Sequence, residues 1–384
     1  GAAIAYCNLG GGQDELVFDG GSLALDARGR VLAAGWQFRE DLVIADLDFP
    51  ASVRTSRGVA GLAPIPWRPP SRPPAAPTRR PRLDPLEERY AALALGLRDY
   101  VRKNGFDTAV LGLSGGIDSA LTACLAVDAL GTGHVVGIVM PSRFSSPDTQ
   151  HDAKALAQHL GIRCEELPIE PCFTAYLDTV KRLFGRRPAD VTEQNLQARI
   201  RGTLLMALSN KFGWLVLTTG NKSEMATGYC TLYGDMAGGF AVIKDVPKTL
   251  VYQLARWRNR GGTFLAAEGV PPAEGLAANR RGPIPERVFT RAPTAELAPN
   301  QKDTDMLPPY QMLDPILKAY VEEDRSIQDM LRTTRFKPET VRRVIHMVDR
   351  SEYKRRQGPP GIKITPKAFG KDRRMPNTNR YRER

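Results

Sequence analysis

Cysteine is scarce in this sequence, with five residues among 384. Cys7, Cys124, Cys164, Cys172 and Cys230 are scattered and form no CxxC pair, so we expect neither a disulfide framework nor a cysteine zinc site. The four histidines show no HExxH pattern, which argues against a zinc hydrolase. No apolar run approaches the roughly 18 residues of a membrane helix, and no signal peptide is visible. These absences predict a soluble, cytoplasmic protein with no membrane partner.

An initiating methionine is also missing. The chain begins GAAIAYCNLG, which has the character of the middle of an apolar strand. We interpret the sequence as a fragment whose first domain is cut.

Positive charge exceeds negative charge only at the C-terminal end. The formal net charge is +12, and residues 331–384 hold 17 Lys and Arg against 5 Asp and Glu, so the whole excess lies there. A basic tail of this kind binds nucleic acid, binds the phosphates of a small ligand, or forms a solvated surface. The charge alone leaves these three interpretations open.

Proline and glycine divide the chain into three regions. Residues 1–48 alternate short apolar runs with Gly and Asp turns, which predicts β-hairpins, one of them turning at residues 27–30. Residues 64–85 contain nine prolines in 22 positions, a density that excludes helices and sheet ladders and favours an extended spacer. We therefore expect a β-rich region at 1–63, a linker at 64–85 and the main domain at 86–384.

Helical and strand patterns alternate after the linker. Apolar strands are expected at DTAVLGLS, HVVGIVMP, RCEELPI and WLVLTT, with helices before and between them. This order predicts the α/β class, with a doubly wound parallel sheet that binds ligands at the carboxyl ends of its strands. Residues 260–310 are rich in loops, and two or three helices are expected between Tyr310 and Met347. Residues 357–384 have no periodicity, so their order would depend on contacts with the rest of the protein.

The first of these strands runs directly into a helix through Leu113-Ser114-Gly115-Gly116-Ile117-Asp118-Ser119. The glycines allow close backbone approach, and the helix start offers free N–H groups and a positive dipole end, so this segment is suited to bind phosphate. Ser114 and Ser119 add hydroxyl donors, and Asp118 is suited to hold Mg²⁺. The alternative is a tight strand-to-helix turn without a ligand. No Lys-Ser/Thr follows, so the segment is not a Walker A loop.

The string SGGxDS resembles the PP-loop of ATP pyrophosphatases, which split ATP between the α and β phosphates and adenylate a substrate oxygen. Later segments are similar to NAD synthetases, in the order TEQNLQARIRG, LVLTTGNKSE, GYCTLYGD, IKDVPKT, PTAELAPNQKDTDMLPPYQMLD and YKRRQGPPGIKITPKAFGKDRR. The resemblance spans residues 114–374 and implies a PP-loop fold related to the adenine nucleotide alpha hydrolases. It also implies ATP-dependent amidation of deamido-NAD (nicotinic acid adenine dinucleotide) to NAD through an adenylated carboxylate, with release of AMP and pyrophosphate.

The same resemblance implies roles for individual residues. It places ATP at Ser114, Gly115, Gly116, Ile117, Asp118, Ser119, Thr219 and Lys248. It places deamido-NAD at Asn195, Arg199, Glu224, Tyr229 and Lys354. Asp118 and Glu224 would bracket Mg²⁺ and, together with Lys248, would be the catalytic set, because a cation is needed where pyrophosphate charge develops. By sequence alone Lys248 is equally a solvated residue near a helix start, and Asn195 and Arg199 are an ordinary i, i+4 surface pair.

Residues 6–20, YCNLGGGQDELVFDG, are similar to the late part of the nitrilase-like amidase domain that is fused to bacterial glutamine-dependent NAD synthetases. The resemblance implies glutamine as the nitrogen donor of an intact parent and free ammonia for this fragment, since the family's amidase Glu, Lys and nucleophilic Cys precede this segment. Cys7 is therefore not expected to be that nucleophile. The family further implies a homodimer or larger homo-oligomer, and exposed strand edges in residues 1–63 predict poor solubility.

The alternative function is that of a tRNA-modifying PP-loop enzyme or an RNA-binding protein that uses the basic tail on phosphates. The tail contains few aromatic residues, Tyr353, Phe369 and Tyr381, and no cysteine pair is available for thiolation. Nucleic acid is therefore not the expected partner.

Overall fold

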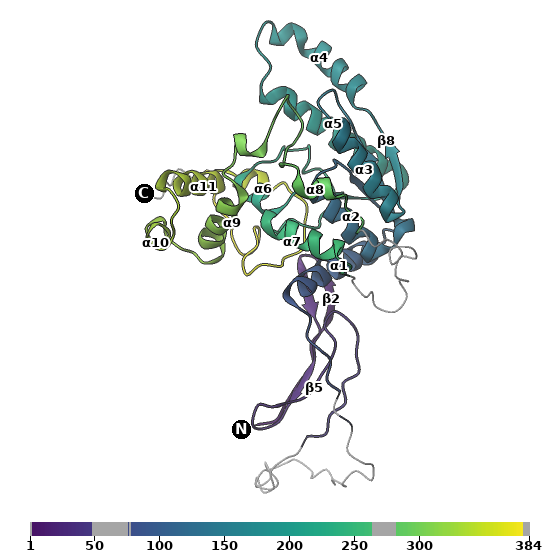
Figure 1. The fold of residues 1–384 in the computed structure, drawn as a ribbon, viewed down its shortest axis with the longest axis vertical. Helices are drawn as coiled ribbons and strands as arrows, with labels where there is room; N and C mark the ends of the chain where they lie inside the picture. The colour runs from purple at the N-terminus through teal and green to yellow at the C-terminus, as the bar shows by residue number, and fades with distance from the viewer. Residues whose placement is uncertain (1, 48–75, 77, 263–281, 379–384) are drawn as a thin grey trace. The chain divides into compact units, whose positions relative to one another are not determined.

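The computed structural model describes residues 2–47, 76, 78–262 and 282–378 (Figure 1). The chain divides into two compact units, the first made of residues 1–11 and 18–88 and the second of residues 12–17 and 89–384. Among the described residues, no helix combines the length and the apolar character needed to cross a lipid bilayer.

The first unit contains a small antiparallel sheet in the order β1-β4-β5. Its strands are β1 (Ile4–Tyr6), β4 (Leu23–Leu25) and β5 (Val31–Ala34). The predicted hairpin turn between β4 and β5 is confirmed, and Gly29 within it has a φ of 79°. Glycine adopts this left-handed conformation without a steric penalty.

The end of the proline-rich stretch pairs with this sheet. The backbone N–H of Ala34 donates to the carbonyl of Thr78 at 2.8 Å, and that of Arg80 donates to the carbonyl of Ala34 at 3.0 Å. The expectation that this stretch excludes sheet pairing is therefore wrong at residues 78–80. These residues are not prolines and so retain their N–H groups. Residues 64–75 and 77 lie outside the described part of the chain.

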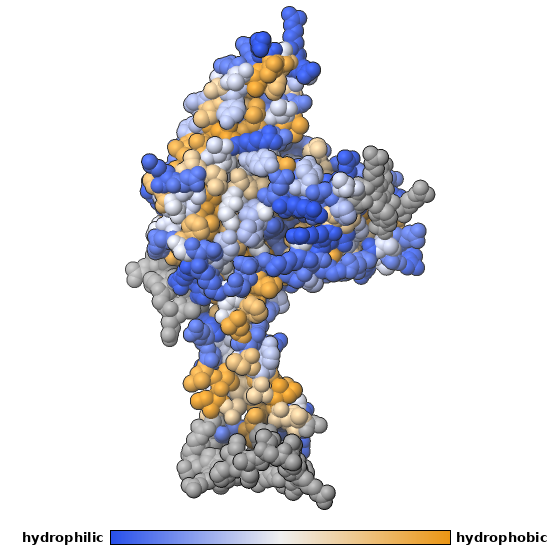
Figure 2. Space-filling model, turned by 180° about the vertical axis from the view of Figure 1, so that it is seen from behind, coloured by the Kyte–Doolittle hydropathy of each residue, from blue (hydrophilic) through white to orange (hydrophobic). Residues whose placement is uncertain are grey.

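Several apolar side chains of the first unit lie in contact with solvent. Ile4, Tyr6, Leu9 and Val31 are between 44% and 64% exposed, and hydrophobic surface is visible over this part of the chain in Figure 2. Exposed apolar side chains next to unpaired strand edges favour self-association. Poor solubility stays a prediction.

Strands β2 (Gly10–Gln13) and β3 (Leu16–Asp19) form a two-stranded sheet, and the tip between them belongs to the second unit. The tip lies against helix α1 (Pro85–Lys103), where the Asp99 carboxylate accepts a hydrogen bond from the N–H of Gly12 at 2.7 Å. The N–H of Lys363 donates to the carbonyl of Glu15 at 2.8 Å. The tip is thereby held between α1 and the C-terminal segment.

A five-stranded parallel sheet in the order β10-β9-β6-β7-β8 forms the centre of the second unit. The strands are β6 (Ala109–Gly112), β7 (Val135–Val139), β8 (Arg163–Glu166), β9 (Leu215–Thr218) and β10 (Phe240–Ala241). The four predicted strands are confirmed. The two-residue edge strand β10 was not predicted, because so short a strand has no readable alternation.

Helices cover both faces of this sheet, which confirms the α/β, doubly wound prediction. The bounds are α2 (Ile117–Leu130), α3 (Pro147–Leu160), α4 (Glu170–Phe184), α5 (Val191–Phe212), α6 (Lys222–Thr227) and α7 (Lys248–Asn259). Val110, Val136 and Val216 pack in one cluster with side chains of α4 and α5. Helix α2 contacts β6 and β7, and helix α3 contacts β7 and β8. Successive strand residues point to opposite faces of a sheet, so these two helices lie on the face opposite to α4 and α5.

Local capping explains where these helices begin. The Ser146 hydroxyl accepts the N–H of Thr149 at 3.1 Å at the start of α3. Capping boxes start α5, through Asp190 and Glu193, and α6, through Asn221 and Glu224. In each case a side chain satisfies N–H groups that have no partner within the helix.

A second helical layer follows residue 282. It comprises α8 (Glu286–Thr290), η4 (Asp303–Asp305, a 3-10 turn), α9 (Tyr310–Leu317), the π-helical turn η5 (Lys318–Glu322), α10 (Ile327–Thr333), α11 (Pro338–Arg350) and α12 (Glu352–Arg355). Another 3-10 turn, η2 (Thr132–His134), lies between α2 and β7 in the sequence. In α11 the buried residues Val341, Val344, Ile345 and Val348 follow the helical period and pack in a cluster with α9 and α10. The predicted helices between residues 310 and 347 are confirmed.

The C-terminal tail has neither helix nor strand between residues 357 and 378, as predicted, and it lies against β10. The N–H of Ala241 donates to the carbonyl of Pro360 at 2.8 Å. The Asp245 carboxylate accepts the N–H groups of Ile364 and Thr365 at 2.9 and 2.8 Å. These hydrogen bonds hold the tail in place, although it has no helix or strand of its own.

Candidate active site

The loop between β6 and α2 is braced by its own polar groups. The Ser114 hydroxyl accepts the N–H of Gly116 at 3.2 Å and lies 3.1 Å from the Ser119 hydroxyl. Ser119 in turn donates to the carbonyl of Gly116 at 3.0 Å. The first turn of α2 has no side-chain cap, so its N–H groups are available to an anion.

Glycine is required at position 115 for two independent reasons. Its φ is 76°, a left-handed value that L side chains rarely adopt. A Cβ at this position would also collide with the carbonyl oxygen of Thr149 on α3. The loop therefore packs directly against the backbone of α3, and no space remains for a side chain at position 115.

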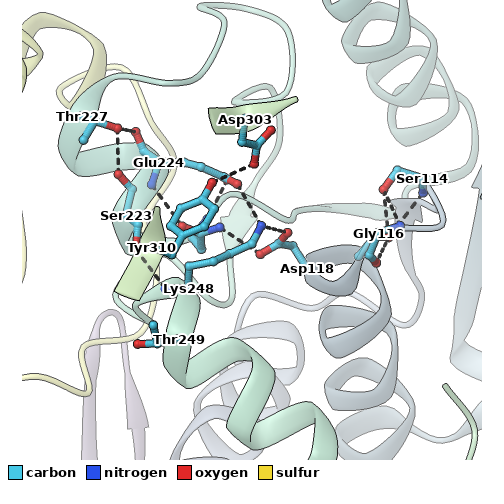
Figure 3. Close-up of polar contacts among 12 residues, drawn as sticks. Ser114, Gly116, Asp118, Ser223, Glu224, Thr227, Lys248, Thr249, Asp303 and Tyr310 are labelled. Carbon is cyan, nitrogen blue, oxygen red and sulfur yellow. Dashed lines mark hydrogen bonds and ion pairs between the residues drawn. The ribbon is translucent and has the colours of Figure 1, made fainter. Parts of the chain in front are cut away.

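Two carboxylates and one ammonium group meet beside this loop (Figure 3). Lys248, the first residue of α7, places its Nζ 2.5 Å from Asp118 Oδ2 of α2 and 3.4 Å from Glu224 Oε1 of α6. Asn221 connects the two acids, because its Nδ2 donates to Asp118 Oδ1 at 2.9 Å while its backbone N–H donates to Glu224 at 3.3 Å. The three functional groups come from three helix starts at the carboxyl edge of the sheet.

This cluster is largely shielded from water. The side chains of Lys248, Asp118 and Glu224 are 3%, 17% and 16% exposed. Burial raises the pKa of Glu224, and the nearby charge of Lys248 opposes that rise. For Lys248, burial alone would lower the pKa, but the carboxylates of Asp118 and Glu224 raise it above its ordinary value. Lys248 is therefore a fixed cation.

Oxygen ligands from two carboxylates fit a magnesium ion whose remaining ligands are water and substrate phosphates. Asp118 and Glu224 offer such a pair, and Lys248 now partly neutralises it. Within the described residues, no group of three or more His, Cys, Asp or Glu side chains forms a closed cage for a metal. The donor set fits an open Mg²⁺ site and does not fit a structural zinc site.

The phosphate loop and the charged cluster line one cleft of about 760 Å³. Most residues that the sequence assigned to ATP or deamido-NAD line it: Ser114, Gly115, Gly116, Ile117, Asp118, Asn195, Thr219, Glu224, Tyr229, Lys248 and Lys354. Lys354 Nζ donates to the carbonyls of Gly228 and Cys230, both at 2.7 Å. The structure therefore brings together residues that lie as far apart as 114 and 354 in the sequence.

Two of the assigned residues do not line this cleft. Ser119 is 2% exposed and its hydroxyl braces the loop from below. Arg199 turns its Nε to the carbonyl of Leu232 at 3.2 Å. For either side chain to contact a ligand, the ligand would have to approach it from outside this cleft.

Sequence reasoning missed several polar residues around the cluster. Asp303 accepts a hydrogen bond from the Tyr310 hydroxyl at 2.8 Å, and both lie close to Glu224 in Figure 3. Asp314 accepts from Ser223 Oγ at 2.5 Å and from the N–H of Thr249 at 2.8 Å. Both acids lie in the segment 293–314 that resembles NAD synthetases, but the resemblance assigned neither of them a role. Asn221, in contrast, could have been found from the capping-box spacing to Glu224.

Comparisons with known proteins agree with this geometry. The family model for NAD synthase matches residues 89–358. The glutamine-dependent NAD(+) synthetase of Thermotoga maritima is 49% identical over an alignment that covers 99% of this chain and 65% of that protein. The solved glutamine-dependent NAD+ synthetase of Acinetobacter baumannii, in complex with ADP, is 42% identical, with a TM-score of 0.61 and coverage of 100% of this chain and 63% of that one.

A shorter protein also matches this chain. The NH3-dependent NAD synthetase of Campylobacter jejuni is 25% identical, with a TM-score of 0.53, and the match covers 71% of this chain and 96% of that chain. The present chain thus spans less than two thirds of the length of the two glutamine-dependent relatives, but accounts for nearly all of the ammonia-dependent one.

Proposed function

The chain belongs to the NAD synthase family, and from this premise we propose that it amidates deamido-NAD to NAD with ATP as the activating substrate. The observation that carries the proposal is the meeting of a phosphate-binding loop with Asp118, Glu224 and Lys248 in one cleft. A nucleotide triphosphate needs N–H donors, a metal-binding carboxylate pair and a fixed cation, and this cleft offers all three.

In the proposed reaction a carboxylate oxygen of deamido-NAD attacks the α-phosphorus of ATP, and pyrophosphate leaves. Ammonia then attacks the adenylated carboxyl carbon, AMP leaves with the bond electrons, and a proton is lost to solvent. The free N–H groups of residues 117–119, at the start of α2, would bind the leaving pyrophosphate, and the charge of Lys248 would stabilise the negative charge that develops on it. Asp118 and Glu224 would hold Mg²⁺, which would neutralise phosphate charge.

Deamido-NAD is proposed to lie further along the cleft. Asn195, Tyr229 and Lys354 line it beyond the charged cluster, and Lys354 is held in place by two carbonyl oxygens. Arg199 is assigned to the same ligand only by the family resemblance. An assembly of two or more copies, as proposed for the family, is one way in which a ligand could reach Arg199 from the other side.

Ammonia is the proposed nitrogen donor for this chain, with glutamine as the donor in a longer protein. The proposal rests on the similarity to an ammonia-dependent synthetase, which covers 71% of this chain and 96% of that one, and on the glutamine dependence of the longer relatives. Residues 1–63 are proposed to correspond to the late part of a nitrilase-like amidase domain, and residues 64–85 to the linker that follows it.

The test is turnover of the chain with deamido-NAD, Mg-ATP and ammonium. NAD, AMP and pyrophosphate should appear in equal amounts, and formation of ADP in their place would reject the proposed chemistry. Asp118→Asn should abolish turnover while the protein keeps its fold, as measured by circular dichroism. Asp178→Asn is the matched control, because this carboxylate is exposed on α4 and does not line the cleft.

A further inference from the structure

Arg291, the residue that follows α8, connects the phosphate loop to the interior of the protein. Its Nη1 donates to the carbonyl oxygen of Gly115 at 3.3 Å, and its Nη2 is paired with the carboxylate of Asp152 on α3. The Asp152 side chain is 1% exposed, so Arg291 is anchored on a buried carboxylate. One guanidinium group thus links the phosphate loop to α3.

The contact with Gly115 controls the orientation of a peptide group in the loop. A peptide unit is planar, so its carbonyl and the following N–H point in opposite directions. With the Gly115 carbonyl held by Arg291, the N–H of Gly116 is directed to Ser114 Oγ, at 3.2 Å. Without Arg291, the carbonyl oxygen would be free to turn into the cleft, where its negative end would repel phosphate.

Arg287 provides an internal comparison one helical turn earlier. It also pairs with Asp152, at 3.0 Å, and with Asp148 at 2.8 Å. Its side chain is 50% exposed, and it is not among the residues that line the cleft. Arg291 lines the cleft and is 24% exposed. Both arginines therefore neutralise the same buried carboxylate, but only Arg291 contacts the phosphate loop.

We propose that Arg291 is a positioning residue for the ATP phosphates, which holds the Gly115 peptide in the orientation that keeps the loop receptive to anions. The inference rests on the proposed function. It adds a residue outside the loop, and outside the charged cluster, to the set that determines how tightly ATP is held. Asp152 is the anchor that sets the direction of the guanidinium group.

The experiment compares Arg291→Gln, Arg291→Lys and Arg287→Gln in the full chain. Binding of Mg-ATP is measured by titration calorimetry without a second substrate, and KM for ATP and for deamido-NAD is measured in turnover. Without the charge-assisted hydrogen bond from Arg291, ATP binding would have to restore the orientation of the Gly115 peptide, so Arg291→Gln should raise the Kd and the KM for ATP by about tenfold or more. Its KM for deamido-NAD should stay near that of Arg287→Gln.

Arg291→Lys separates geometry from charge. A lysine keeps the positive charge but lacks the planar fork that reaches Asp152 and Gly115 together, so it should leave most of the loss in place. Equal ATP affinity of Arg291→Gln and Arg287→Gln would overturn the proposal, and so would full recovery by Arg291→Lys. Wild-type protein that binds Mg-ATP but makes no NAD would reject the proposed function alone, since the binding comparison would still decide the role of Arg291.

Discussion

Replacement of Lys222 is expected to destabilise the second unit strongly. The side chain is 2% exposed, and its Nζ lies 3.0 Å from Asp245 and 2.7 Å from Glu322. It also donates to Thr365 Oγ1 at 2.6 Å and to the carbonyl of Lys367 at 2.9 Å. One buried ammonium group therefore connects α6, the segment after β10, η5 and the C-terminal tail.

The magnitude follows from the charges that would remain. Lys222→Met keeps the length of the side chain but removes the cation from two carboxylates that are 4% and 8% exposed. Removal of one partner of a buried ion pair costs about 3–5 kcal/mol. In a domain of this size each kcal/mol lowers the melting temperature by about 2–4 °C. We therefore expect the melting temperature to fall by roughly 6–20 °C.

Scanning calorimetry of the second-unit transition measures this shift. Lys244→Met is the matched control, because Lys244 donates to the carbonyl of Pro359 at 2.6 Å and makes no ion pair within the described residues. Its loss should cost about 1.5–3 kcal/mol, less than the loss expected for Lys222→Met. Adding Asp245→Asn and Glu322→Gln to Lys222→Met should recover part of the loss, because no buried charge then remains unpaired. Melting of Lys222→Met within about 2 °C of Lys244→Met would refute the reasoning.

Two further predictions concern the glycine loop and the thiols. Gly115→Ala should abolish Mg-ATP binding in calorimetry, because the new Cβ would collide with Thr149, whereas Gly105→Ala, at a similar φ of 75° but with open space around it, should cost about 1 kcal/mol and leave binding intact. Equal effects of the two changes would contradict the steric argument. Cys124, whose pKa burial raises to about 12, should resist iodoacetamide until the protein unfolds, while the exposed Cys172 should react in the native state. Mass spectrometry of the labelled peptides checks this, and native-state labelling of Cys124 would show that its site is open.

The architecture of the second unit was predictable because its signals are local. Buried parallel strands are read as short apolar runs, and glycines mark the helix ends, as Gly131 and Gly161 do for α2 and α3. The two-residue strand β10 has no such signal. Its position depends on pairing with β9 and on contacts with the tail, which no local pattern encodes.

The candidate site was predictable in its loop and less so in its surroundings. Residues 114–119 combine glycine, hydroxyl and carboxylate groups at a strand-to-helix junction, and this pattern has a direct chemical meaning. Asp303 and Asp314 reach the cluster from positions about 80 to 90 residues after Glu224. Both lie in the segment 293–314 that resembles NAD synthetases, but the segment alone does not show which of its side chains contact the cluster. Arg291 was missed for the same reason: its importance comes from a carbonyl oxygen 176 positions away in the sequence.

The Lys and Arg residues of the basic tail have different surroundings in the folded chain. Lys363 pairs with Asp372 at 2.8 Å, Lys371 pairs with Glu15 at 2.8 Å, and the buried Arg355 pairs with Glu352 at 3.0 Å. Nucleic-acid binding requires cations that can replace the counterions of phosphates, and cations already paired with carboxylates are poorly suited to that exchange. Lys354, in contrast, lines the cleft and donates only to carbonyl oxygens among the contacts described. These three paired cations are therefore poorly placed to bind a nucleic acid, whereas Lys354 lies at the cleft proposed for deamido-NAD.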